Sequence, residues 1–521
     1  MRMDGAVMAS PIAGGPATAP RPPLALLQQR VSPIAALVAV LLLALALRLV
    51  FAAATGLGND ESYTLVTSRT LALSYFDHPP MAWWLAHLAS RLGGSEAPLL
   101  VRTPFLLLST ASTLLMYLLT ARLFGRWAGV WAALMMACAP VLGLTGAAWV
   151  LPDGPLVAFL LAGALVLAHV LFDRGARPAG WLLAGFLGGL AMLSKYHGVF
   201  FLAGTLLFLL VSPRHRHWLA SPWPYAGAAV ALAMFTPVIV WNVQHQFASL
   251  AFQGSRATGA HLQLLMPLVS VAGIAVFLTP WIWAGLAAAA WRALRGRPAN
   301  PRALLLLCLA AGPVLVFPMV AAWSSAKPFF HWAAPGYLML FPLLGRAMAR
   351  RWPIARGVRI WTVWAAGFTA AGVAVVAVLS LVPAPVAAIT GTDPLRELAA
   401  WSDLKAAFQR HGLTPERYAF VTAPVWHEAG KVGYALGPAW PTACMGADCR
   451  GFLIADVQRG HEGADAVLVL DAGSAGEIAD MGRRFRSLEP VETLELRHSG
   501  ALVGRVAVLV GRGYRDPSRA Q

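Results

Sequence analysis

The chain has 521 residues, of which 58% are hydrophobic and only 12% are charged. Soluble globular proteins carry about 25% charged residues, so this composition excludes a chain that is water-soluble over most of its length. The formal net charge of +17 does not indicate nucleic-acid binding. The excess arginines stand in short segments between apolar runs, where they set membrane topology.

The acidic residues divide the chain into two parts. Only seven of the 23 precede residue 390, and the other 16 follow it. We therefore predict a membrane-embedded body over residues 33–385 and a soluble C-terminal domain over residues 386–521. Residues 1–32 are rich in Pro, Ala and Gly, and we expect them to form a disordered cytoplasmic tail.

The body is predicted to be an all-α polytopic membrane domain. A bilayer span needs about 20 apolar residues. About eleven runs reach or approach that length: 33–54, 102–123, 127–144, 153–172, 180–194, 197–212, 223–243, 265–291, 303–323, 333–349 and 359–383. Arginines cluster in every second gap between these runs. This alternation places the N-terminus inside and the C-terminal domain outside.

The first external loop, residues 55–101, holds an unusual group of polar residues. Asp60 and Glu61 directly follow the first span, and adjacent carboxylates there are costly unless they bind or catalyse something. The simpler alternative is that Asp60 only caps the next helix, which does not explain the second carboxylate. We expect surface helices over 63–75 and 81–92. Further polar residues of this loop are Tyr63, Asp77 and His78.

More polar motifs fall on the same outer face. Asp153 begins a span, where helix capping is the alternative role. Lys195 could bind a phosphate as a point charge or extend its ammonium group to the membrane surface. For Trp241, sugar stacking and a place in the interfacial aromatic belt are equally favoured. The remaining candidates are Tyr196, Asn242, Arg256, Lys327 and His331.

The C-terminal domain is predicted to be a small α/β domain without a catalytic motif. A helix is expected from Asp393-Pro394 to just before Gly412, and another near 474–485. Strands are expected over 418–422, 452–455, 466–470 and 505–510. Cys444 and Cys449 would form a disulfide in an oxidising compartment, while a zinc site is a weaker alternative.

The order of motifs Asp-Glu-Ser-Tyr, Phe-Asp-His-Pro-Pro, Pro-Asp-Gly-Pro, Leu-Ser-Lys-Tyr-His-Gly, Trp-Asn and Lys-Pro resembles a known family. It is similar to bacterial membrane glycosyltransferases related to protein O-mannosyltransferases and lipid A aminoarabinose transferases. The resemblance covers roughly residues 33–350. It implies the GT-C fold, a multi-pass inner-membrane location with a periplasmic C-terminal domain, and a sugar donor on polyprenyl phosphate.

The resemblance also assigns residues. Asp60 matches the catalytic acid of the family's first external loop, and Asp153 matches a second acidic position. His78 stands where the aminoarabinose transferases have a lysine, which suggests a different donor or acceptor. With Asp60 as general base, direct displacement would invert the anomeric centre. The phosphate partners would be Lys195, Arg256 and Lys327.

Other assignments remain open. The expected partners are the lipid-linked donor, membrane lipids and an envelope acceptor, which could be lipid A, another glycan, a lipid or a protein. No spacing compels a metal site, although a divalent metal is an open alternative. A transporter or flippase predicts charges within the spans, and these are nearly absent from the sequence. A non-catalytic scaffold leaves the first-loop carboxylates without a role.

Overall fold

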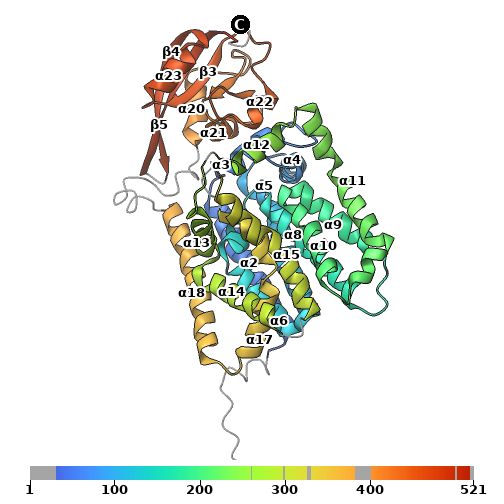
Figure 1. Ribbon diagram of the computed structural model, residues 1–521. Coiled ribbons are helices and arrows are strands. Elements are labelled where there is room, and N and C mark those ends of the chain that lie inside the picture. The colour runs from blue at the N-terminus through green and yellow to red at the C-terminus, as the bar shows by residue number, and fades with distance from the viewer. Residues whose placement is uncertain are drawn as a thin grey trace, which may run out of the picture.

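The computed structural model describes residues 31–259, 261–296, 300–324, 330–381, 401–498 and 501–516. A helical body and a small sheet-containing C-terminal domain lie end to end (Figure 1). This confirms the coarse fold class expected from the sequence. The predicted boundary at residues 385/386, the predicted helix start at Asp393-Pro394, and most of the N-terminal tail lie outside the described residues.

Within the described residues, six helices are long and apolar enough to cross a membrane. Leu42 and Leu43 on the first of them are 62% and 66% exposed, as expected for side chains that face lipid. These helices are α2 (Pro33–Ala54), α5 (Pro98–Phe124), α8 (Asp153–Phe172), α11 (Pro222–Gln244), α15 (Pro301–Ala321) and α18 (Arg356–Leu381).

Two further candidate spans are sharply bent. Helix α6 (Arg126–Ala137) meets the segment Val141–Ala148 at 90°, and α13 (Met266–Leu278) meets α14 (Pro280–Arg295) at 111°. Counting each bent pair as one span gives up to eight in the described part of the chain. The predicted count of about eleven is therefore not confirmed.

The remaining predicted runs form shorter helices. They are α9 (Gly180–Ser194), η2 (Tyr196–Gly198) with α10 (Val199–Val211), and α16 (Ala334–Leu338) with α17 (Phe341–Arg351). The backbones of these shorter helices pack closely against their neighbours. A Cβ on Gly185 of α9 would lie 1.9 Å from the Gly227 carbonyl oxygen of α11. Small residues permit such backbone contact between membrane helices.

The first external loop lies at the end of the body beside the C-terminal domain (Figure 1). It contains α3 (Asn59–Ser68) and α4 (Met81–Gly93). The second predicted surface helix is confirmed, but the first begins before and ends before the predicted range 63–75. Its start is fixed by a capping box, in which the Glu61 carboxylate accepts a hydrogen bond from the Gly58 amide at 2.9 Å.

The C-terminal domain has a five-stranded sheet in the order β2-β1-β3-β5-β4. Strand β1 (Val421–Ala423) pairs in parallel with β2 (Thr442–Cys444) and β3 (Ala466–Asp471), whereas β5 pairs antiparallel with β3 and β4. The other elements are α20 (Ser402–Arg410), α21 (Trp426–Leu436), α22 (Gly451–Ala455), α23 (Ala475–Gly482), β4 (Phe485–His498) and β5 (Ala501–Tyr514).

Two predictions for this domain are resolved by the structure. The strand predicted over 452–455 is wrong, because this run forms the single helical turn α22. Four apolar residues do not distinguish a strand from a buried turn of helix. Cys444 and Cys449 form a disulfide with Cα atoms 5.4 Å apart.

Candidate active site

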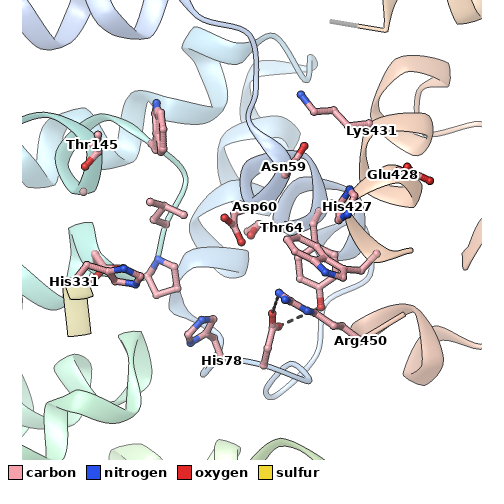
Figure 2. A pocket seen from close by; sticks show the side chains of 18 of the residues that line it. Asn59, Asp60, Thr64, His78, Thr145, His331, His427, Glu428, Lys431 and Arg450 are labelled. Carbon is pink, nitrogen blue, oxygen red and sulfur yellow. Dashed lines mark hydrogen bonds and ion pairs between the residues drawn. The ribbon is translucent and has the colours of Figure 1, made fainter. Parts of the chain in front are cut away.

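A cavity of about 730 Å³ lies between the helical body and the C-terminal domain. The first loop, the start of α8 and helix α12 (Ala248–Ala257) line it on one side. Helix α21 and the ends of β4 and β5 line it on the other. Figure 2 shows Asp60 near the centre of this view, between His331 on one side and His427 and Arg450 on the other. The two parts of the chain therefore share one site.

Asp60 occupies the first turn of α3 and faces the cavity together with Thr64. The N-cap of α3 is Gly58, and the carboxylate that completes the capping box is that of Glu61. Asp60 is therefore not the capping residue, and the structural alternative considered from the sequence does not account for it. Its position, one helical turn before Thr64, puts both side chains in the cavity lining.

Glu61 lies outside the cavity lining and is only 1% exposed. Its carboxylate accepts two hydrogen bonds from the Arg102 guanidinium, at 2.8 and 2.5 Å, and one from the Val150 amide at 3.0 Å. Arg102 also donates to the backbone carbonyls of Ala52, Thr55 and Gly56. The pair thus ties the loop carrying Asp60 to the segment preceding Asp153.

Asp153 and Lys195 form an ion pair at the cavity wall. The Lys195 ammonium donates to both carboxylate oxygens of Asp153 at 2.9 Å. The Lys195 side chain is 3% exposed and that of Asp153 is 22% exposed. The lysine charge is therefore compensated within the protein. This arrangement supports a role for Lys195 in holding Asp153 more than one as an independent phosphate ligand.

Asp77 and Tyr63 form a second buried pair in the cavity lining. The Tyr63 hydroxyl donates to Asp77 at 3.2 Å, and burial raises the pKa of both side chains above their usual values. The adjacent His78 also lines the cavity, and its pKa is lowered well below the usual range by burial and then by the charge of Lys195. The lowered pKa favours a neutral imidazole at His78, whereas a lysine at this position would carry a charge.

Three predicted site residues lie behind the cavity wall. Trp241 is 3% exposed and stacks on His245 at 4.2 Å. Asn242 donates to the Val238 carbonyl and accepts from the Leu250 amide, and the Tyr196 hydroxyl shares a 2.6 Å hydrogen bond with Ser249. These contacts fix the turn between α11 and α12. Arg256 and His331 do line the cavity, whereas Lys327 lies outside the described residues.

The C-terminal domain contributes residues that the sequence did not single out. Trp426, His427, Glu428 and Lys431 on α21, with Arg450, line the cavity. Burial, together with Glu477 and Asp471, raises the pKa of Glu428 to about 7. The consecutive residues Trp-His-Glu are a visible local signal, but nothing in the sequence shows that α21 packs on the first loop.

Comparisons with known proteins agree with this architecture. Residues 77–241 match the family described as dolichyl-phosphate-mannose-protein mannosyltransferase. The chain is 27% identical over 310 residues to lipid A galacturonosyltransferase RgtD of Rhizobium johnstonii, a match that spans 59% of this chain and 63% of that protein. The match thus covers less than two thirds of the curated relative.

Solved structures show the same fold. ArnT from Cupriavidus metallidurans bound to undecaprenyl phosphate superposes with a TM-score of 0.62 and 17% identity, over 91% of this chain and 97% of that chain. Its apo form gives 0.61 and 18% over the same shares. The predicted resemblance to the GT-C membrane glycosyltransferases is confirmed. At this identity the structural likeness supports the fold, and the substrates need separate arguments.

Proposed function

We propose that this protein is a membrane glycosyltransferase that moves a sugar from a polyprenyl-phosphate donor to an envelope acceptor at the periplasmic face. The observation that carries the proposal is the shared cavity. Its lining contains both Asp60 and the Asp153–Lys195 pair, where the ends of apolar helices meet the C-terminal domain. A lipid-linked donor can reach such a site while its polyprenyl chain stays in the bilayer.

The proposed chemistry is a single displacement. Asp60 accepts the proton of the acceptor hydroxyl, a bond forms between that oxygen and the anomeric carbon, and the bond to the phosphate oxygen breaks. Polyprenyl phosphate leaves with the electron pair and remains in the membrane. Attack from the face opposite the phosphate inverts the anomeric centre. Asp153, held by Lys195, orients the acceptor.

Arg256 is the best-placed cation for the donor phosphate among the described residues. Its guanidinium lies over Trp332 at 5.1 Å and over Phe252 at 5.2 Å, and it lines the cavity. Stacking against two rings holds the planar guanidinium group at the cavity wall. The undecaprenyl phosphate bound to the similar ArnT structure supports a donor of this class.

The acceptor and location rest on separate observations. The name of the relative RgtD supports lipid A as the first acceptor to test. The Cys444–Cys449 disulfide supports an oxidising compartment for the C-terminal domain. Arginine-rich segments at the far end of the body support a cytoplasmic side there. Together these favour an inner-membrane enzyme that works on the periplasmic face.

Replacing Asp60 with Asn tests the proposal. Asn keeps the shape of the side chain but cannot act as a carboxylate base, and loss of a general base lowers rates about 100- to 10,000-fold. Transfer would be measured on purified full-length protein with polyprenyl-phosphate galacturonate and lipid A. The sugar and the acceptor follow the name of the relative RgtD, and the lipid carrier follows the proposed donor class. Asp403→Asn, on an exposed position of α20, is the matched control. Normal turnover of Asp60→Asn would exclude Asp60 as the base.

A further inference from the structure

Arg450 of the C-terminal domain adopts a backbone conformation that side chains rarely take. Its φ is 45° and its ψ is −125°, a combination that glycine reaches far more readily. The residue directly follows Cys449 of the disulfide and precedes Gly451. Strained positions of this kind occur where the surrounding structure requires a particular side chain, often at a functional site.

The neighbouring backbone meets the first loop at close range. The Gly451 amide donates to the Tyr63 hydroxyl at 2.9 Å. A Cβ on Gly451 would lie 2.6 Å from the Tyr63 hydroxyl oxygen. The conformation at residue 450 therefore lets the backbone approach Tyr63 while the arginine side chain turns toward the cavity (Figure 2).

The Arg450 side chain is held flat but its donors are not saturated. Its guanidinium carbon lies 3.7 Å from the centre of the Trp426 ring. Nη1 is 3.5 Å from the Asp77 carboxylate, and Nε is 3.6 Å from Asp448. Nε is buried without a hydrogen-bond partner among the described residues. These are ionic contacts that hold charge in place, looser than a bidentate salt bridge.

We propose that Arg450 is a positioning residue of the active site, supplied by the C-terminal domain. It fixes the Asp77–Tyr63 pair and, through Tyr63, the helix α3 that carries Asp60. This inference rests on the proposed transferase function. The contacts form a continuous path: Arg450 faces Asp77, Asp77 accepts from Tyr63, and Tyr63 lies on α3 three residues after Asp60.

The path has an electrostatic consequence that a purely structural contact would lack. Asp77 is 4% exposed and is faced by Tyr63 of α3, Arg256 of α12 and Arg450, with Tyr196 nearby. Burial raises the pKa of Asp77, and Arg450 is the largest opposing influence. Removing Arg450 should therefore let Asp77 take up a proton at higher pH, which weakens its hold on Tyr63.

The experiment compares Arg450→Ala, Arg450→Gly and Arg450→Lys with the wild type. Arg483→Ala is the matched control, because Arg483 is 73% exposed, directly follows α23 and pairs with Asp480 of that helix. We expect Ala and Gly to lower kcat at least tenfold with little change in the KM for the donor. The acidic limb of the pH profile should move to higher pH in both. Lys keeps the charge and should keep most of the wild-type profile.

Two further readouts separate positioning from folding and from substrate binding. Glycine relieves the backbone conformation, so Arg450→Gly should have a higher Tm than Arg450→Ala with the same loss of kcat. Hydrogen exchange of residues 59–68 should be faster in both variants and unchanged in Arg483→Ala. Wild-type turnover in Arg450→Gly, or unchanged exchange of α3 with lost turnover, would overturn the positioning role. If the wild type shows no transferase activity but the Arg450 variants still show faster exchange in α3, the result counts against the transferase function and leaves the positioning role in place.

Discussion

Asp60 and Glu61 are neighbours in sequence but face opposite surroundings. Successive residues of an α-helix point about 100° apart, so one carboxylate faces the cavity while the other faces Arg102. The Glu61–Arg102 pair is enclosed, with side chains 1% and 0% exposed. The two adjacent acids therefore differ in their surroundings: Asp60 lines the cavity, and Glu61 holds the loop in place.

Replacing Glu61 with Gln should lower stability and leave chemistry largely intact. The change leaves Arg102 buried without its counter-charge, and breaking a buried ion pair costs about 3–5 kcal/mol. Thermal unfolding in detergent and the amount of folded protein in membranes would measure the loss. Turnover per folded molecule should stay near that of the wild type. A Glu61→Gln protein with normal Tm but no activity would show that Glu61 acts on the substrate.

Motif order selected some residues that line the cavity and others that lie behind its wall. Asp60, Asp153, Asp77 and His78 line the cavity, as expected for polar residues that are costly beside a membrane without a purpose. Side-chain direction was not predictable, because it depends on how α11 and α12 pack. Trp241, Asn242 and Tyr196 were predicted to contact substrate for their chemistry. In the structure they contact neighbouring protein groups, and their predicted role stays a prediction.

At the scale of elements, the contact between α3 and α21 joins the two parts of the site. A Cβ on Gly430 of α21 would lie 2.8 Å from the Tyr63 amide nitrogen. The next residue, Lys431, donates from its ammonium group to the Leu57 carbonyl just before α3. Arg69 at the end of α3 donates to the Gly433 carbonyl at 3.0 Å. The helix carrying Asp60 is therefore held at both ends by the C-terminal domain.

Gly430→Val should disturb this interface. The added carbons meet backbone atoms of α3, which cannot rotate away as a side chain can, and overpacking of this kind costs about 1–3 kcal/mol. The Tm should fall and turnover should fall with it. Gly476→Ala on α23 is the control, because nothing lies within 4 Å of its added Cβ. That variant should gain up to about 1 kcal/mol from helix propensity. Equal Tm values for the two variants would contradict the close packing.

The positions of the helices were predicted better than the points at which the helices bend or end. Apolar run length indicates where a helix lies, and all the predicted runs contain helix in their described parts. It does not show that α13 and α14 meet at 111°. Thr279 has a φ of 70° at that point, directly before Pro280, and only the folded packing requires this turn. The strands β2 and β4 were likewise missed, because their pairing depends on distant partners.

For the whole molecule, composition predicted two parts but not their joint cavity. Charge density distinguishes lipid-facing from water-facing segments, which needs no knowledge of contacts. The seating of α21 on α3 joins residues far apart in the chain, such as Gly433 and Arg69. Contacts of this kind leave no periodic pattern in either segment. The sequence therefore indicated a separate C-terminal domain, whereas in the structure this domain forms one wall of the cavity.

The side of the membrane on which the cavity lies can be tested by mapping the topology of the chain. Arg177 and Arg216 lie in exposed segments between membrane helices, and the positive-inside rule places both in the cytoplasm. The disulfide between Cys444 and Cys449 favours an oxidising compartment, and so the opposite side of the membrane, for the C-terminal domain. Reporter fusions after Arg177 and Arg216 should therefore read as cytoplasmic, and fusions after residue 401 as periplasmic. A periplasmic thiol reagent should label the domain only after reduction. A cytoplasmic C-terminal domain would put the whole cavity on the wrong side for a periplasmic acceptor.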